Sequence, residues 1–208
     1  MEQKKYWDQA AAGKDFTTPL NFKVFSRYVG REAAVLDIGC GYGRVLEELR
    51  HNGYTRLTGL DFSEGMINRG RKLYPHLDLR AQDAAGLENE SFDAVLLVAV
   101  LTCLARDEDQ LRLLGEIRRV LRPGGILYIN DFLLNQDERN LTRYQEFQGR
   151  HGIYGVFELP DGALVRHHDP LWVEQSLAPF ETLFLDRVVY TTMNGNKSNG
   201  YCYLGRRI

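Results

Sequence analysis

The sequence contains only three cysteines, no long hydrophobic run and no marked excess of either charge, and each of these features excludes a class of protein. Cys40, Cys103 and Cys202 are odd in number and lack metal-ligand spacing, so we predict neither a disulfide framework nor a metal site, and we expect a reducing, cytoplasmic environment. The longest apolar run, residues 94–101, is well short of the roughly 18 residues that a membrane-spanning helix needs, and the first residues lack the apolar core of a signal peptide. A formal net charge of -2 produces no field that would attract nucleic acid or anionic lipid, so we expect neither nucleic acid nor a membrane as a partner.

What the sequence does contain is an ordinary globular composition, with 44% hydrophobic and 26% charged residues. This composition supplies enough apolar material for one core and excludes a mainly disordered chain. A length of 208 residues fits one domain with an insertion. We therefore expect residues 1–208 to form a single domain.

Ser63 and Asp107 are the expected N-caps of two helices. As far as residue 131, short apolar stretches alternate with stretches of helical periodicity. This alternation predicts a parallel sheet with helices on both faces. Two β-rich runs, 183–193 and 201–204, flank a turn rich in Asn and Gly, which predicts an antiparallel hairpin. We therefore expect an α/β fold with a doubly wound, mostly parallel seven-stranded sheet that ends in an antiparallel C-terminal hairpin. The expected parallel strands lie at residues 35–38, 57–61, 77–81, 92–101 and 126–130.

Two segments lie outside this alternating core. Residues 1–33 are expected to form an N-terminal helical cap, with Thr18 as the N-cap of one helix. Residues 132–180 are expected to form an insertion, in which a hairpin turns at Pro160-Asp-Gly162 and a helix follows at 170–176. We expect the insertion to overhang the carboxyl edge of the sheet and to cover the substrate.

Three glycines at alternate positions, Gly39, Gly41 and Gly43, follow the first predicted strand. A turn without Cβ atoms lets the backbone pass close to a ligand at the start of the next helix. The nicotinamide dehydrogenase fingerprint needs Gly or Ala where this chain has Arg44, because helix and strand must pack closely there. The glycine turn therefore predicts a ligand site but disfavours a dehydrogenase.

With the acid that precedes it, Asp37, this turn resembles the first motif of the class I S-adenosylmethionine (SAM) dependent methyltransferases, and among these the small-molecule type. Asp61 ends the second strand where the family places the acid that takes both ribose hydroxyls. Asp83 follows the third strand where the family places the residue that accepts from the adenine amino group. The later strands and the terminal hairpin match as well, so the resemblance covers about residues 34–131 and 181–208. It implies a Rossmann-like methyltransferase fold, with SAM as cofactor and S-adenosylhomocysteine (SAH) as its product.

The chemistry of the acidic side chains agrees with these implied roles. An ionised carboxylate only accepts hydrogen bonds and a ribose diol offers two donors, so Asp61 can take both; its alternative role is to cap the following helix. Asp37 either ties down backbone N–H groups of the glycine turn or faces the methionine ammonium group. Asp83 either contacts adenine or forms an Asx-turn. The predicted cofactor-binding residues are Asp37, Gly39, Gly41, Asp61, Phe62, Met66, Asp83, Ala84, Val98 and Trp7.

Several of these residues are apolar. Phe62 and Met66 would flank the adenine, although Met66 also fits the core. Val98, at the carboxyl end of the central strand, should lie at the crevice where open α/β sheets bind ligands. The resemblance implies that Tyr6 or Trp7, near the N-terminus, folds over the cofactor; their alternative role is to anchor the terminus.

His167 and His168 are the candidates for a general base near neutral pH. Adjacent residues of a strand point to opposite faces, so at most one of the two can face the site. Methyl transfer from a sulfonium depends mainly on positioning the acceptor, so few catalytic side chains are needed.

We therefore predict a SAM-dependent methyltransferase that acts on a small, partly aromatic or apolar molecule. Two alternatives stay open: a module that binds SAM or SAH without turnover, and a nicotinamide-dependent dehydrogenase. The sequence specifies neither the acceptor, nor the methylated atom, nor the oligomeric state.

Overall fold

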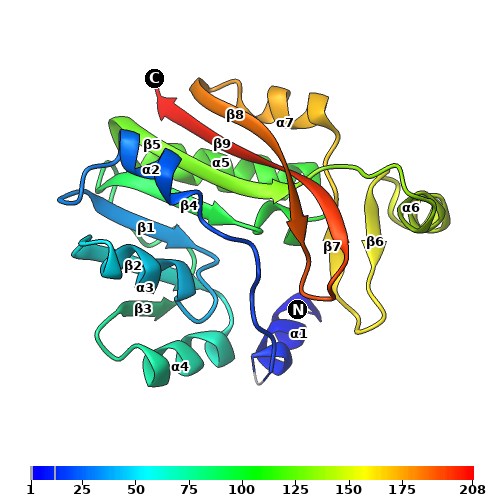
Figure 1. The fold of residues 1–208 in the computed structure, drawn as a ribbon, viewed down its shortest axis with the longest axis horizontal. Coiled ribbons are helices and arrows are strands. Elements are labelled where there is room, and N and C mark those ends of the chain that lie inside the picture. Colours follow the sequence, from blue (N-terminus) through cyan, green and yellow to red (C-terminus); the bar gives the residue numbers. More distant parts are fainter. Residues whose placement is uncertain (1, 12) are drawn as a thin grey trace.

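The computed structural model describes residues 2–11 and 13–208, and its core is a seven-stranded sheet (Figure 1). The strands of this sheet are β1 (Ala34–Ile38), β2 (Arg56–Asp61), β3 (Asp78–Ala81), β4 (Phe92–Val98), β5 (Leu121–Phe132), β8 (Phe180–Thr191) and β9 (Lys197–Arg207). Their order is β3-β2-β1-β4-β5-β9-β8. The first five are parallel, whereas β9 is antiparallel to β5 and β8 is antiparallel to β9. The predicted mostly parallel sheet with an antiparallel C-terminal hairpin is therefore confirmed.

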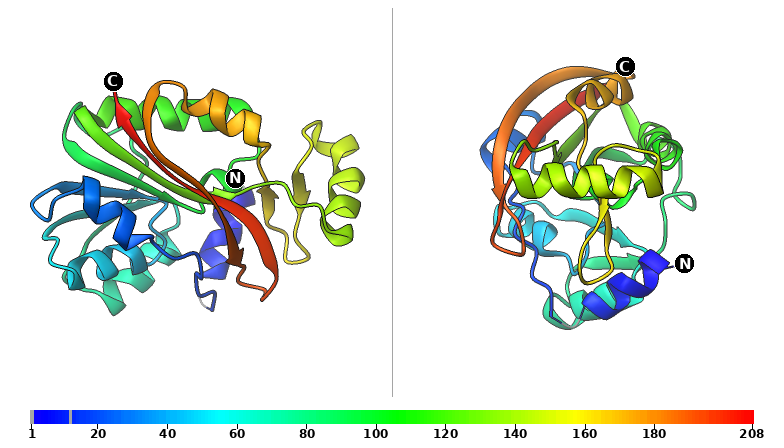
Figure 2. Two further views of the ribbon diagram at one scale, coloured as in Figure 1. Left: turned by 45° about the horizontal axis from the view of Figure 1, so that its top comes forward. Right: turned by 90° about the vertical axis from the view of Figure 1, so that its right-hand side faces the viewer.

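Helices cover both faces of the sheet (Figures 1 and 2). The strands are buried on both sides, and successive side chains enter different cores: Val35 packs with one hydrophobic cluster and Leu36 with the other. On the Val35 side lie α2 (Phe22–Tyr28), α3 (Arg44–His51) and α4 (Glu64–Leu73); on the Leu36 side lie α5 (Asp107–Val120) and α7 (Pro170–Leu177). None of the described helices is long and apolar enough to cross a bilayer.

The central strand β4 ends earlier than its apolar run predicts. Ala99, the first residue after it, has a positive φ of 57°, and its N–H donates to the Asn130 carbonyl over 2.8 Å. The chain then enters the short 3-10 helix η1 (Leu101–Cys103). The expected strand 92–101 is therefore corrected to Phe92–Val98, because a left-handed residue breaks the extended backbone at the carboxyl edge of the sheet.

Two of the three expected N-caps are wrong. Ser63 does cap α4, since its side chain accepts from the Met66 N–H. Asp107 is instead the first residue of α5, and its carboxylate pairs with Arg166 at 2.5 Å. Thr18 lies in an extended stretch, and Asn21 caps α2 by accepting from the N–H of the third residue beyond it. A distant partner engages Asp107, whereas the local residue Asn21 takes the cap that was expected of Thr18.

The N-terminal helix α1 (Glu2–Ala10) lies against α4 (Figure 2). The Asp8 carboxylate accepts from the Ser63 hydroxyl at 2.6 Å and from the Gly65 N–H at 3.1 Å. Gly65 makes this approach possible, because a Cβ there would lie 2.8 Å from the Asp8 carbonyl oxygen. The contact therefore holds α1 beside the carboxyl end of β2.

Residues 132–180 contain the expected hairpin, β6 (Val156–Glu158) with β7 (Leu164–Arg166), and the expected helix α7. They also contain a helix that the sequence pattern does not predict, α6 (Glu138–His151), which lies beside the hairpin (Figure 2). Only Asn140 and Tyr144 of α6 are buried, so its sequence lacks the broad apolar stripe that predicts a helix.

Candidate active site

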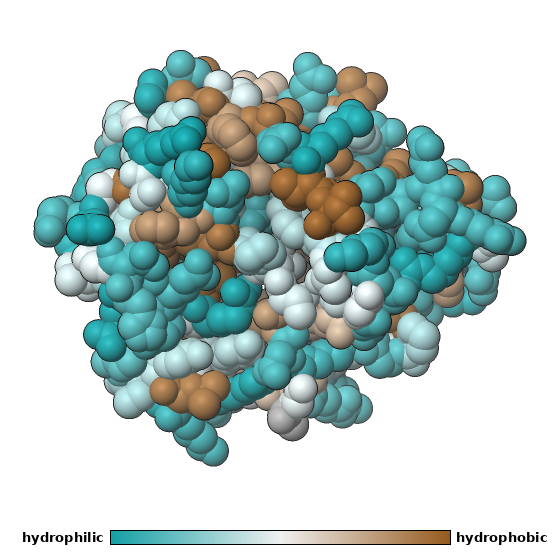
Figure 3. All heavy atoms as spheres, in the orientation of Figure 1, coloured by the Kyte–Doolittle hydropathy of each residue, from teal (hydrophilic) through white to brown (hydrophobic). Residues whose placement is uncertain are grey.

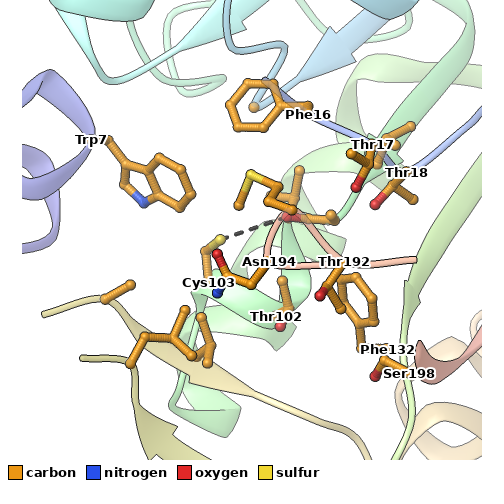
Figure 4. A pocket seen from close by; sticks show the side chains of 18 of the residues that line it. Trp7, Phe16, Thr17, Thr18, Thr102, Cys103, Phe132, Thr192, Asn194 and Ser198 are labelled. Carbon is orange, nitrogen blue, oxygen red and sulfur yellow. Dashed lines mark hydrogen bonds between the residues drawn. The ribbon is translucent and has the colours of Figure 1, made fainter. Parts of the chain in front are cut away.

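A large cavity opens at the carboxyl ends of β1, β2 and β4, where ligands bind in open α/β sheets. It encloses about 1430 Å³, counted to its open mouth. Its walls come from the N-terminal segment, the glycine turn, α6, the β6–β7 hairpin and the turn between β8 and β9. Figure 4 shows Trp7 and Phe16 on one side of this space, with Thr102, Phe132 and Ser198 on another. The lining therefore extends from the strand ends and the glycine turn to the insertion.

Seven of the ten predicted cofactor residues line this cavity: Trp7, Asp37, Gly39, Asp61, Phe62, Met66 and Val98. Gly41, Asp83 and Ala84 do not line it. The Asp83 carboxylate accepts from the Ala85 N–H at 3.0 Å, which is the Asx-turn alternative, and Ala84 is buried in the core on the Leu36 side. Contacts of these residues with adenine therefore stay predictions.

The turn that follows β1 adopts left-handed backbone at each of its three glycines. The N–H groups of Gly39 and Cys40 both donate to the Leu60 carbonyl, at 2.7 and 3.0 Å, which draws the turn onto β2. Gly41 has a φ of +56°, and a Cβ there would lie 2.3 Å from the Phe16 ring. Glycine is required at this position by backbone conformation and by the close approach of the N-terminal segment.

Asp61 connects the glycine turn to the following helix. One carboxylate oxygen accepts from the Ser63 N–H at 2.8 Å and the other from the Gly41 N–H at 2.9 Å. Each oxygen has two lone pairs, so both can accept a further hydrogen bond from a ligand in the cavity. Burial raises the pKa of Asp61, the two backbone N–H groups lower it, and the nearby Asp8 carboxylate raises it.

Asp37 is more deeply buried than Asp61, and its Oδ1 atom has no hydrogen-bond partner. Burial raises the pKa of this carboxyl group to about 8, against the lowering influence of the Arg44 guanidinium. Arg44 donates through Nη2 to the Thr18 carbonyl, while its Nε is buried without a partner. An unpartnered carboxyl oxygen and an unpartnered guanidinium N–H on one cavity wall fit a ligand that carries both an ammonium and a carboxylate.

The two histidines lie in different environments, as expected for adjacent residues. His167 lines the cavity. His168 does not; its Nδ1 lies 2.9 Å from the Phe132 carbonyl oxygen, and its Nε2 lies 3.0 Å from the Gln110 side chain. Burial lowers the pKa of His168 to about 4, so this ring is neutral near pH 7 and holds the insertion against the core.

Sequence reasoning missed several lining residues, namely Phe16, Thr17 and the α6 arginines Arg139 and Arg143. Thr192, Met193, Asn194 and Asn196, between β8 and β9, and Ser198 of β9 also line the cavity. The sequence predicts a turn at 194–200 but not that this region reaches a ligand. None of these segments carries a local motif, because each reaches the cavity only through the tertiary fold. The i, i+4 spacing of the two arginines is the one available signal, and it becomes informative only once α6 is known.

A family model described as a methyltransferase domain matches residues 36–129. The eEF1A lysine and N-terminal methyltransferase of Danio rerio is 34% identical over 111 residues, which cover 49% of this chain and 16% of that protein. This chain spans between 16% and 49% of the length of the curated relatives that it matches.

Solved structures share the fold at low sequence identity. A SAM-dependent methyltransferase from Methanosarcina mazei has a TM-score of 0.83 at 24% identity, covering 89% of this chain and 97% of the other. The 1,6-didemethyltoxoflavin-N1-methyltransferase of Burkholderia thailandensis, with bound 1,6-didemethyltoxoflavin and SAH, has a TM-score of 0.65 at 19% identity, covering 98% of this chain and 79% of the other.

Proposed function

We propose that this chain is a class I SAM-dependent methyltransferase and that it transfers a methyl group from SAM to a small-molecule acceptor. The observation that carries this proposal is the pair of strand-end carboxylates in the cavity. Asp61 has free lone pairs at the end of β2, and Asp37 has an unpartnered oxygen at the end of β1. These two acids match the two ends of SAM, a ribose diol and a methionine ammonium.

In this proposal the chain's own residues bind and orient SAM. Asp61 accepts from the ribose hydroxyls, Asp37 accepts from the ammonium group, and Arg44 donates to the carboxylate. Phe62, which is 44% exposed, offers an apolar surface to the adenine. When bound, SAM supplies a methyl group already activated on a sulfonium. Trp7 and Phe16, whose ring centroids lie 6.1 Å apart, exclude water from the bound cofactor.

The walls of the cavity support a small acceptor. The β6–β7 hairpin, α6 and residues 192–198 surround the space on the side away from the glycine turn. We assign residues 132–180 the role of the substrate cover and residues 1–33 that of the cofactor cover. Among the relatives, the Danio rerio protein is named for a lysine acceptor and the Burkholderia enzyme for a small molecule. A cavity walled by these segments favours a small-molecule acceptor.

The direct test is Asp61→Ala, with SAH affinity measured by calorimetry. A hydrogen bond to a charged group contributes about 1.5–3 kcal/mol, so affinity should fall by roughly ten- to a hundredfold. Circular dichroism reports whether the variant is folded. Wild-type SAH affinity in the folded variant would show that Asp61 does not bind the cofactor. Asp83→Ala, measured in parallel, tests the predicted contact with adenine. A similar loss of SAH affinity would indicate that Asp83 contacts the ligand.

A binding module without turnover is the second candidate, because the same acids would hold SAM in both cases. Transfer of label from methyl-labelled SAM into a metabolite extract separates the two. A labelled small molecule supports the enzyme; tight SAH binding with no labelled product in repeated extracts supports the module.

A further inference from the structure

We propose that the acceptor is a planar small molecule that carries an anionic group, which the α6 residues Arg139 and Arg143 bind. This inference rests on the proposed function and names the chemical class of its substrate. It draws on the part of the cavity that lies away from the glycine turn. There the lining consists of α6, the β6–β7 hairpin and the end of β5.

The carboxylates of the cavity wall lie on one side. In the described part of the chain, the only carboxylates that line the cavity are Asp37 and Asp61, at the ends of β1 and β2, and Arg44 lines the same wall. The opposite wall carries Arg139 and Arg143, one turn apart on the same face of α6. Arg139 pairs with Asp137 at 3.7 Å, so a cationic acceptor such as a lysine side chain would meet mainly the like charge of Arg143, whereas an anion would meet an opposite charge.

Arg143 is a cation without a compensating carboxylate. Its guanidinium carbon lies 3.6 Å from the centroid of the Phe157 ring, and its Nη2 donates to the Asn140 side chain. Its Nε is buried without a hydrogen-bond partner, and no carboxylate of the described residues forms an ion pair with it. A half-buried charge with an unused N–H is costly unless a ligand pairs with it, and a guanidinium is suited to bidentate binding of an anion.

His167 completes the proposed anchor as a hydrogen-bond donor. Its Nδ1 lies 2.5 Å from the Tyr144 hydroxyl and 3.2 Å from the Asn135 amide nitrogen. The Asn135 amide nitrogen also donates to the Leu133 carbonyl and the Ser198 hydroxyl, both at 3.0 Å, so the Tyr144 contact decides the tautomer. The Tyr144 hydroxyl accepts from the Asn135 backbone N–H, and His167 Nδ1 is nearer to it than its other acceptor, the Asn140 side chain at 3.4 Å. We therefore assign Nδ1 as the acceptor of the Tyr144 proton and place the proton of the neutral ring on Nε2.

The same contacts argue against His167 as the general base. Burial lowers the pKa of His167 well below its usual value, and the guanidinium groups of Arg143 and Arg139 lower it further. A ring that already accepts at Nδ1 and carries a proton on Nε2 has no free lone pair for a substrate proton. The structure therefore assigns His167 a positioning role for an oxygen of the acceptor.

The apolar part of this wall is largely aromatic. The Phe132 ring stacks on the His167 ring with centroids 5.7 Å apart, and Phe157 meets His167 edge to face at 4.9 Å. Leu159 and Val165 of the hairpin line the same region. Aromatic faces beside a guanidinium suit a planar acceptor whose anionic group points toward α6.

Calorimetry with benzoate, phenyl phosphate and benzamide, each added to the protein saturated with SAH, tests this inference. The wild type should bind one of the two anions at least tenfold more tightly than benzamide, and the preferred anion distinguishes a carboxylate from a phosphate. Arg143→Gln should weaken binding of that anion by at least tenfold and leave benzamide binding unchanged. Arg150→Gln is the matched control, because Arg150 lies on the same helix, pairs with Glu158 at 3.0 Å and does not line the cavity.

Two outcomes would overturn the inference: equal binding of the anions and benzamide to the wild type, or equal loss of anion binding in both arginine variants. SAH affinity, measured separately in each protein, keeps this test distinct from the proposed function. Failure of the wild type to bind SAH contradicts the methyltransferase proposal, whereas intact SAH binding without anion preference contradicts only the anionic acceptor.

Discussion

At the scale of single residues, Asp37 combines deep burial with an unused hydrogen-bonding atom. Its carboxyl group is 2% exposed, and its Oδ1 has no partner among the described residues. Burial without compensation destabilises the ionised form, which accounts for a pKa raised to about 8. The cofactor-free protein therefore holds Asp37 largely protonated at pH 7, and a cationic ligand group would favour its ionisation.

We predict that SAH binding at pH 7 releases close to one proton. The ammonium group would lower the pKa of Asp37, so the proton present in the free protein leaves on binding, and affinity should rise by up to about tenfold per pH unit between pH 6 and pH 7. Calorimetry in two buffers of different ionisation enthalpy measures the released proton. Asp37→Asn should abolish the release, while Asp186→Asn, at an exposed position of β8, should not. Unchanged proton release in Asp37→Asn would contradict this account.

The same raised pKa predicts how the stability of the cofactor-free protein varies with pH. Because the folded state holds this proton more tightly than the unfolded state, the contribution of Asp37 to the free energy of unfolding falls as pH rises from about 4 to about 8. Asp37→Asn should therefore raise the melting temperature at pH 8 more than at pH 5. An equal shift at both values would show that the carboxyl group does not titrate in this range.

At the scale of elements, the contact between α1 and α4 decides whether the N-terminal aromatic residues reach the cavity. Asp8 of α1 accepts hydrogen bonds from Ser63 and Gly65 at the start of α4. Ser63 also caps α4 by itself, so α4 can form without α1. The contact therefore positions Trp7 more than it stabilises the helix beneath it.

We predict that Gly65→Ala weakens SAH binding several-fold without unfolding the protein. The added Cβ would lie 2.8 Å from the Asp8 carbonyl oxygen and 3.2 Å from the Ala11 Cβ, so α1 must move away, while alanine itself favours helix α4. Gly115→Ala in α5 is the matched control, because nothing lies within 4 Å of its added Cβ. It should raise the free energy of unfolding by about 0.5–1 kcal/mol and leave SAH affinity unchanged. Equal SAH affinity in both variants would show that α1 does not contribute to the site.

At the scale of the whole molecule, the cavity is assembled from segments far apart in the sequence. Residues 6–7 and 16–18, the insertion and the β8–β9 turn meet over the carboxyl ends of the parallel strands. On the face shown in Figure 3, the described residues present a mainly hydrophilic surface with scattered apolar groups. Aromatic rings instead gather at the cavity, as Figure 4 shows for Trp7, Phe16 and Phe132.

Because a bound cofactor would connect these separate segments, SAH should stabilise the whole fold. At one hundred times its dissociation constant a ligand adds about 2.7 kcal/mol, which should raise the melting temperature by roughly 5–10 °C in a domain of this size. NAD at the same concentration should produce no shift, because Arg44 stands where the dehydrogenase fingerprint needs Gly or Ala. A rise in melting temperature with NAD and none with SAH would contradict the methyltransferase proposal and favour the dehydrogenase alternative.

Sequence reasoning was most reliable where local chemistry decides the structure. Short apolar runs predicted the parallel strands, the glycines predicted a turn of close approach after β1, and the strand-end position of Asp61 predicted its place at the cavity. Sequence reasoning was less reliable where contacts with distant residues decide the local structure. Asp107 pairs with Arg166 instead of capping α5, and Ala99 ends β4 inside an apolar run.

The sequence by itself indicated the fold, the resemblance to SAM-dependent methyltransferases and the two carboxylates proposed to hold SAM, because these depend on alternation, glycines and strand ends that neighbouring residues specify. Only the tertiary structure decided which wall faces the acceptor. It brings Arg143 of α6 against Phe157 of the hairpin, and it directs His167 into the cavity and His168 into the core. Such a wall depends on the packing of segments that share no local pattern, so the charge that selects the proposed acceptor is visible only in the folded chain.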